Sequence, residues 1–145
     1  MRTVIQRALN ASVEVDKKIT GSIEYGLVIL VGFTEGDTIQ DIEYMVNKIV
    51  NLRIFDDEFG VMNKSILDIN GTILSISQFT LYADTKKGRR PSYANALGGA
   101  EAIQLYDIFN QKLNEVVHTE TGIFGAEMKV NLTNDGPVTI IMESR

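Results

Sequence analysis

The chain has 145 residues, of which 44% are hydrophobic and 23% are charged, and its formal net charge is −5. That length and composition predict a single globular domain over residues 1–145. The absence of cysteine excludes disulfides, thiolate nucleophiles and cysteine-bound metals, and the single histidine, His118, excludes a centre with several histidine ligands. Because the net charge is negative, the chain is not held on nucleic acid by overall electrostatics, and any RNA contact must be local.

Membrane and secretion signals are missing from the sequence. The longest apolar run, Leu27–Val31, is far too short to span a bilayer. Residues 1–7 carry charge and contain no apolar core of the length that signal peptides have. We therefore expect a cytoplasmic protein that does not bind membranes.

Strand patterns fill the first third of the chain, and a helix follows. The predicted strands are 2–8, 12–15, 19–23 and 25–33, and the last is apolar throughout, as in a strand buried on both faces. Apolar residues then recur at helical spacing over 38–51, which predicts a helix with one core face. Asp37 followed by Gln40 resembles a capping box at its start.

Three consecutive acidic residues, Asp56, Asp57 and Glu58, follow a short predicted strand at 53–55. Such oxygens bind hard metal ions, but a solvated hairpin tip is the simpler interpretation, because carboxylates in a turn stay hydrated. We expect no metal and no cofactor. The dipeptide at 70–71, Asn-Gly, is a two-residue hairpin signal that leads into the next strand.

A strand-like run covers 72–82, and its second half is unusually polar. Alternate side chains of a strand share a face, which places Gln78 and Thr80 on one face and Ser77 and Phe79 on the other. Buried polar groups need partners, so the run is either an edge strand with one wet face or part of a site. Polar side chains and free N–H groups at a fraying strand end are what ester hydrolysis needs to hold an oxyanion.

A basic loop is predicted at 83–92. It contains Lys86, Lys87, Arg89 and Arg90, which are four of the 14 basic residues within five positions. One interpretation is a solvated loop, and the other is a local contact with RNA phosphates.

The last third predicts a helix and two strands. Helical spacing covers 98–117, and His118 lies at its end, where the helix dipole favours a cation, so that a capping role is preferred over catalysis. Strand patterns follow at 127–133 and 138–142, with a turn at 134–137. This order of elements predicts an α+β fold with a mostly antiparallel sheet and two main helices packed on one side.

The predicted turn consists of Asn134, Asp135, Gly136 and Pro137. Gly136 has no side chain to shield its carbonyl, and Pro137 has no N–H. The pair therefore presents carbonyl oxygens that a ligand can approach closely. From the residues alone a trans Gly-Pro bond is expected, since cis bonds are a small minority.

Two motifs together resemble the signatures of the D-aminoacyl-tRNA deacylases, namely Ser77-Gln78-Phe79-Thr80-Leu81 and Asn134-Asp135-Gly136-Pro137-Val138-Thr139. The resemblance runs along the whole chain and includes the loop 87–93, where the family often has Phe at the position of Tyr93. Either motif alone is weak, but both in this order and at this separation are specific.

The resemblance implies a homodimer that hydrolyses the ester joining a D-amino acid to the 3′ end of tRNA, with a site at the subunit interface. One wall would be the strand end Ser77–Thr80, where N–H groups near Gln78, Phe79 and Thr80 hold the amino acid and its oxyanion. Gly136 and Pro137, joined by a cis bond, would enter from the other subunit.

The same resemblance implies how chirality is read. Main-chain carbonyls of Gly136 and Pro137 would exclude L-amino acids, with Asn134 beside them and Arg7 holding their orientation. Glycine, including glycine mischarged on tRNA-Ala, would pass this filter. The basic loop Lys86–Arg90 is then the candidate for acceptor-stem phosphates.

The chemistry of Thr80 supports one part of this expectation. A hydroxyl without a positioned base is a weak nucleophile at neutral pH, and the sequence guarantees no base beside Thr80. The ribose 2′-OH of the tRNA lies next to the scissile ester. We therefore expect substrate-assisted hydrolysis, in which Thr80 positions the substrate and does not attack.

Two other interpretations remain open at this point. One is a non-catalytic nucleic-acid-binding module, against which the net charge of −5 and the few clustered aromatic residues count. The other is a structural dimer in which the Gly-Pro hairpin locks two sheets together.

Overall fold

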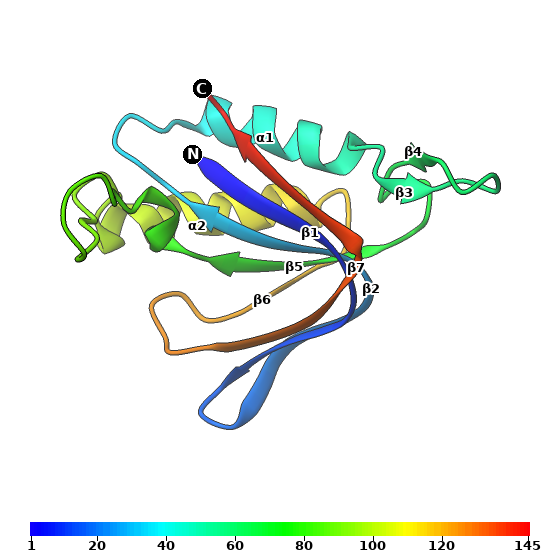
Figure 1. Cartoon of the computed structure of the whole chain (residues 1–145), viewed down its shortest axis with the longest axis horizontal. Helices are drawn as coiled ribbons and strands as arrows, with labels where there is room; N and C mark the ends of the chain where they lie inside the picture. The colour runs from blue at the N-terminus through cyan, green and yellow to red at the C-terminus, as the bar shows by residue number, and fades with distance from the viewer.

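A five-stranded sheet in the order β6-β5-β2-β1-β7 is the frame of the computed structural model, which describes residues 1–145 (Figure 1). Its strands are β1 (Arg2–Val15), β2 (Lys18–Gly32), β5 (Thr72–Ser77), β6 (Thr119–Thr121) and β7 (Lys129–Glu143). The pairs β1–β2 and β1–β7 are antiparallel, whereas β2–β5 and β5–β6 are parallel. The predicted α+β class is confirmed. The sheet is mixed, and its two long pairings, β1–β2 and β1–β7, are antiparallel, as predicted for most of the sheet.

The first two strands are longer than the sequence patterns predicted. The breaks expected at 9–11 and at Glu24 do not occur, and β1 and β2 pair along their whole length. Asn10 adopts a left-handed φ of 48°, which bends β1 without ending its pairing. The far half of the β1–β2 hairpin therefore curves away from the rest of the sheet (Figure 1).

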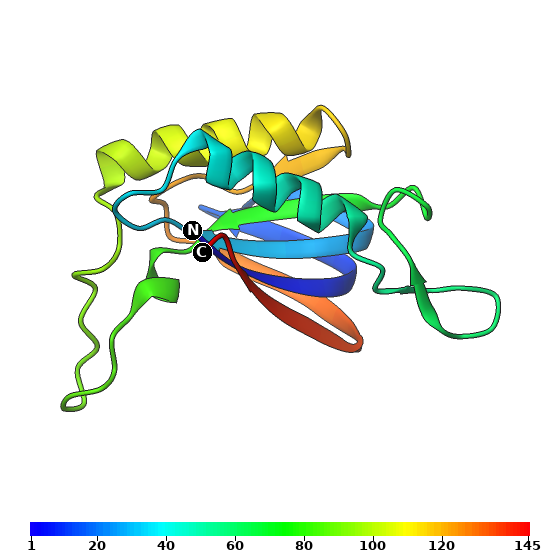
Figure 2. The same ribbon diagram turned by 90° about the horizontal axis from the view of Figure 1, so that it is seen from above.

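Two helices, α1 (Ile39–Asn51) and α2 (Gly99–Asn114), cover one face of the sheet, as predicted (Figure 2). The main core lies between them and the sheet and includes Ile5, Ile29 and Phe109. The cap predicted at Asp37 is wrong by one residue, since Thr38 has the extended backbone and exchanges capping bonds with Asp41. Helix α2 ends earlier than expected, which leaves His118 outside it.

A small hairpin of β3 (Phe55–Asp56) and β4 (Met62–Lys64) follows α1. At its tip, Asp57 Oδ1 accepts hydrogen bonds from the amides of Phe59 and Val61, at 2.9 and 3.0 Å. The acidic cluster thus shapes the hairpin tip. The hairpin predicted at 70–71 is wrong, because β4 does not pair with β5.

The predicted turn at 134–137 is wrong, and with it the terminal hairpin. Both halves of β7 pair with β1, because Ala8 lies opposite Asn134 and Gln6 lies opposite Thr139. The intervening residues 135–138 form a bulge opposite the single residue Arg7, and the Gly136–Pro137 bond within it is cis. The trans bond expected from the residues alone is therefore wrong, and the cis bond implied by the family resemblance is observed.

Neither helix combines the length with the hydrophobicity that a membrane-spanning helix requires.

The parallel pairing of β2 with β5 depends on a glycine. Gly26 lies opposite Thr72, has a φ of +156°, and a Cβ placed on it would lie 1.8 Å from the Thr72 carbonyl oxygen. We expect Gly26→Ala to lower the free energy of unfolding by at least about 2 kcal/mol, because both the backbone angle and the strand contact must change.

Chemical denaturation followed by circular dichroism checks this expectation. Gly99→Ala is the matched control, because a Cβ at Gly99 meets no atom within 4 Å. A free energy of unfolding for Gly26→Ala within about 0.5 kcal/mol of the wild-type value would contradict the account.

Candidate active site

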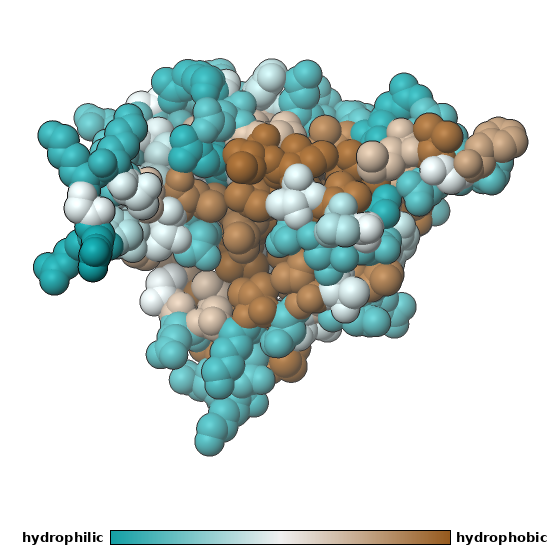
Figure 3. Space-filling view, in the orientation of Figure 1, coloured by the Kyte–Doolittle hydropathy of each residue, from teal (hydrophilic) through white to brown (hydrophobic).

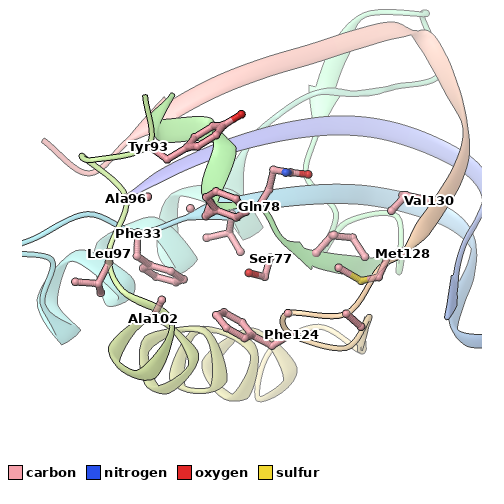
Figure 4. Close-up of a pocket in the computed structure, with 17 residues that line it drawn as sticks. Phe33, Ser77, Gln78, Tyr93, Ala96, Leu97, Ala102, Phe124, Met128 and Val130 are labelled. Atoms are coloured by element: carbon pink, nitrogen blue, oxygen red, sulfur yellow. The ribbon is translucent and has the colours of Figure 1, made fainter. Parts of the chain in front are cut away.

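A cavity of about 530 Å³ opens at the carboxyl ends of the parallel strands β2 and β5. Seventeen residues line it, and twelve of them are hydrophobic, including Phe33, Phe124 and Met128. Ser77 lies in the middle of the lining, with Tyr93 at the rim (Figure 4). A largely apolar cavity with a few polar groups is the usual form of a small-molecule site.

The strand predicted over 72–82 ends at Ser77, and the residues after it form the 3-10 turn η1 (Phe79–Tyr82). Gln78 begins this turn, and its main-chain N–H donates to the Val31 carbonyl at 2.8 Å. The predicted alternation of faces is therefore wrong beyond Ser77. The N–H groups of Phe79 and Thr80 precede the first hydrogen bond of the turn and have no acceptor within it.

The wall of the cavity near this turn comes from several predicted residues. Ser77, Gln78 and Phe79 are among the lining residues, whereas Thr80 is not. The Phe79 ring packs edge-on against Tyr93, with ring centroids 5.1 Å apart. Phe79, the first residue of the turn, thus contacts Tyr93 at the rim of the cavity.

No general base accompanies the Thr80 hydroxyl. Its oxygen accepts a hydrogen bond of 2.7 Å from the side-chain amide of Gln78, which is not a base. Burial raises the pKa of nearby Tyr82 to about 12, with the charge of Asp37 acting in the same direction, so the phenol stays neutral at physiological pH. Within one chain, the hydroxyl of Thr80 is held but not activated.

The single histidine lies at the other end of β5. The carbonyl of His118 accepts from the amide of Ile73, five residues before Gln78, a span of about 16 Å along a strand. The His118 ring is exposed and lies 3.1 Å from the Glu120 carboxylate. The capping role predicted for His118 is wrong, because α2 ends four residues earlier.

Arg7 holds the bulge at 135–138. Its side chain is buried, with 7% exposure, and Nε donates to the Asp135 carbonyl at 3.0 Å. Nη1 donates to the Ile54 carbonyl at 2.9 Å and lies 3.3 Å from the Asp56 carboxylate. These contacts fix Asp135, the residue immediately before Gly136.

Asn134 closes the base of the same bulge. Its side-chain oxygen accepts from the Val138 amide at 3.1 Å, and its side-chain nitrogen donates to the Thr139 hydroxyl at 2.8 Å. Gly136 and Pro137 are themselves exposed. The bulge is thus fixed from both sides and presents Gly136 and Pro137 to solvent.

The two motifs lie apart along the sheet within one chain, because the bulge is in the middle of β7. Ser77 lies beside Val31, and Val31 beside Thr3. The bulge lies beside Arg7, four residues further along β1 from Thr3, which is about 13 Å at the rise of a strand. Neither Gly136 nor Pro137 lines the cavity of its own chain.

The basic loop lies next to the cavity. Asp84 and Ser92 pair across its base, and all residues from Thr85 to Arg90 are exposed. The loop leaves the turn η1 and returns at Tyr93 on the rim of the cavity. The loop projects from the body of the molecule (Figure 2), and its four cations, Lys86, Lys87, Arg89 and Arg90, are exposed.

Several residues of the site carried no recognisable signal in the sequence. Leu97 lines the cavity from the segment that precedes α2. Phe124 and Met128 line it from the loop between β6 and β7. Gly32 packs under the turn, since a Cβ there would lie 2.8 Å from the Gln78 carbonyl. These residues reach the site through tertiary contacts, and a period or motif in the sequence does not reveal such contacts.

Comparison with known proteins places the chain among deacylases. The family model described as D-Tyr-tRNA(Tyr) deacylase matches residues 4–143. Proteins named D-aminoacyl-tRNA deacylase from Clostridium tetani (strain Massachusetts / E88) and Bacillus cytotoxicus (strain DSM 22905 / CIP 110041 / 391-98 / NVH 391-98) are 56% and 57% identical over 146 residues. These matches cover 100% of this chain and 98% and 100% of the relatives.

Two solved structures share the fold. One, described as c-Myc DNA Unwinding Element Binding Protein, has a TM-score of 0.95 and 40% identity, covering 100% of this chain and 99% of that one. The other, described as a probable eukaryotic D-amino acid tRNA deacylase, has a TM-score of 0.85 and 16% identity, covering 98% of each chain. The family match and the two full-length bacterial relatives show that the chain belongs to the D-Tyr-tRNA(Tyr) deacylase family.

Proposed function

We propose that this protein hydrolyses the ester of D-aminoacyl-tRNA, releasing the amino acid and free tRNA as a proofreading step in translation. The observation that carries the proposal is the cavity lined by Ser77, Gln78 and Phe79 in a chain of this family. The relatives named D-aminoacyl-tRNA deacylase support the same reaction. A cavity of about 530 Å³ falls in the range of small-molecule sites.

The complete site is proposed to form between two copies of the chain. Gly136 and Pro137 are exposed, lie in the middle of β7 and do not line the cavity of their own chain. The sheet face turned away from the helices carries a broad apolar area (Figure 3), where Ile141 is 68% exposed. A second copy packed on this face buries that area and brings its Gly136–Pro137 bulge to the cavity.

Chirality is proposed to be read by main-chain atoms. Carbonyl oxygens at Gly136 and Pro137 occupy the direction in which an L side chain must project, whereas a D side chain points elsewhere. The contacts of Arg7 and Asn134 hold the bulge in place, so that the filter does not yield to a bulky side chain. Glycine has no side chain and passes, which extends the substrates to glycine mischarged on tRNA-Ala.

The reaction is proposed to use the tRNA's own hydroxyl. Water attacks the ester carbonyl, and the N–H groups of Phe79 and Thr80 stabilise the negative oxygen that forms. When the intermediate collapses, the bond to the ribose 3′ oxygen breaks. The neighbouring 2′-OH donates its proton to this leaving oxygen and takes up the proton that the attacking water gives up, so that both ribose hydroxyls are restored. Thr80, held by Gln78, positions the substrate.

The basic loop is proposed to hold the acceptor stem. Its four cations, Lys86, Lys87, Arg89 and Arg90, lie beside the mouth of the cavity, in a chain whose net charge is −5. A local cationic segment attracts phosphates where the remainder of the protein does not. The loop thus directs the 3′ end of the tRNA toward Phe79 and Thr80.

One observation favours a second candidate function, a nucleic-acid-binding module without catalysis. The solved structure described as c-Myc DNA Unwinding Element Binding Protein superimposes with a TM-score of 0.95. The net charge of −5 counts against tight binding to bare duplex. Tight binding of duplex DNA at moderate salt without hydrolysis of any aminoacyl ester would favour this second function.

Mirror-image substrates test the proposed reaction. We expect D-Tyr-tRNA to be hydrolysed at least about 100-fold faster than L-Tyr-tRNA, which corresponds to about 2.7 kcal/mol of discrimination. Release of radiolabelled tyrosine over time measures both rates. Equal cleavage of the two substrates would contradict the chirality filter.

The role of the ribose hydroxyl predicts a contrast between two changes. Thr80→Ala should retain measurable turnover, reduced by about 10- to 100-fold through poorer positioning. The wild-type protein should hydrolyse a D-aminoacyl-tRNA that ends in 2′-deoxyadenosine about 100-fold more slowly or slower still, because proton transfer to the leaving oxygen is lost. Single-turnover rates check both, with Thr80→Ser as the control. Complete inactivity of Thr80→Ala together with normal cleavage of the deoxy substrate would assign the attack to Thr80.

Neutralising the basic loop should weaken binding of tRNA. We expect Lys86→Gln/Lys87→Gln to raise KM and to reduce the slope of log affinity against log salt by about 1 to 2. Lys17→Gln/Lys18→Gln, at the exposed tip of the β1–β2 hairpin, makes the same charge change away from the cavity and is the matched control. Equal salt slopes for the two double variants would make the basic loop a solvated face only.

A further inference from the structure

Arg2 joins three segments that are distant in the sequence. Its Nη1 donates to the Leu81 carbonyl at 2.6 Å, and its Nε donates to the Glu143 carboxylate at 2.5 Å. The guanidinium lies 4.8 Å from the centre of the Tyr82 ring. Arg2 therefore connects the start of β1, the end of β7 and the turn η1.

Leu81 is in the last part of η1, where carbonyl groups lack donors within the turn. A guanidinium is well suited to this end, because its charge complements the partial negative charge of the exposed carbonyls. It also offers several donors in one plane, which lets it bind a carbonyl and a carboxylate together. Arg2 uses this geometry to hold the turn at its end.

The turn is also fixed by a hydrogen bond at its start and by packing against β2. The Gln78 amide donates to the Val31 carbonyl at 2.8 Å. Gly32 lies beside Arg2 in the sheet, and a Cβ there would lie 2.8 Å from the Gln78 carbonyl and 3.3 Å from the Leu81 Cβ. The turn thus packs onto Gly32, while Arg2 reaches over it from the neighbouring strand.

The amides of Phe79 and Thr80 lie between these two anchors. Their direction is determined by the ends of the turn, because the turn has only four residues. Arg2 does not line the cavity, and two of its nitrogens are already bound within the chain. An effect of Arg2 on substrate must therefore act through the turn.

Glu143 in turn fixes Arg2. The two residues are direct partners in the β1–β7 pairing, so their side chains lie on the same face at cross-strand distance. Both side chains are partly exposed, at 34% and 45%. The partnership therefore orients the guanidinium more than it stabilises the fold.

We propose that Arg2 is a positioning residue of the deacylase site, which aims the Phe79 and Thr80 amides by holding the Leu81 carbonyl, and that Glu143 orients Arg2. This inference rests on the proposed function, because it assigns those amides to the oxyanion. It adds a residue at the start of β1, outside both signature motifs.

Arg2→Gln and Arg2→Lys test the assignment. We expect Arg2→Gln to lower kcat for D-Tyr-tRNA by about 10- to 100-fold, with KM changed less than about threefold, since an amide shifted by a fraction of an ångström still binds substrate but stabilises the oxyanion poorly. Arg2→Lys should recover only part of kcat, because an ammonium cannot reproduce the planar contact. Glu143→Gln should lower kcat less than Arg2→Gln does.

Arg53→Gln is the matched control. Arg53 Nε also donates to a main-chain carbonyl, that of Asn63, at 2.9 Å, but in the β3–β4 hairpin. We expect its kcat to stay within about twofold of the wild-type value. A loss of kcat in Arg53→Gln equal to that in Arg2→Gln would show a general effect of removing a surface arginine and would overturn the assignment.

Amide signals in NMR spectra give a readout that is independent of turnover. In Arg2→Gln the ¹H–¹⁵N signals of Phe79 and Thr80 should shift, while signals of β5 before Ser77 remain in place. Unmoved Phe79 and Thr80 signals, or an unchanged kcat, would overturn the inference. If the wild-type protein itself cleaves no D-aminoacyl ester, the proposed function fails, and the amide shifts still report whether Arg2 holds the turn.

Discussion

The register of the central strands is the constraint on which the rest of the structure depends. Parallel pairing sets Ser77 beside Val31, and antiparallel pairing sets Arg7 beside Leu27. Because strands are stiff and rise by a fixed length per residue, these pairings separate the row of Ser77 from the Gly-Pro bulge in the middle of β7 by four residues of β1, or about 13 Å. A single chain therefore carries both halves of the proposed site but does not bring them together.

Each half presents main-chain atoms, and each is held by an arginine that donates to a main-chain carbonyl. Arg2 contacts Leu81 at the turn, and Arg7 contacts Asp135 at the bulge. In the proposed function, these backbone groups recognise the ester and its configuration without contacting a particular side chain. The same design explains why the Thr80 hydroxyl has an amide, and not a base, as its partner.

The sequence predicted the elements whose signal is local. Helical spacing located α1 and α2 within a few residues, because an amphipathic face repeats along the helix itself. Local patterns failed where contacts with distant residues determine the backbone conformation. The strand β5 ends at Ser77 although the alternation of residues continues beyond it. Residues 135–138 form a bulge because both halves of β7 pair with β1. The Arg2 contact joins residues 79 positions apart, and no local pattern reveals it.

A purified heterodimer of two defective chains tests the central claim most directly. Phe79→Pro removes one amide of the turn, and Gly136→Ala alters the bulge, where an added Cβ would lie 2.8 Å from the Val138 side chain. If each site combines the turn of one chain with the bulge of the other, the heterodimer contains one intact site and should hydrolyse D-Tyr-tRNA at about half the wild-type rate, while both homodimers are defective. A heterodimer no more active than the two homodimers would contradict a shared site.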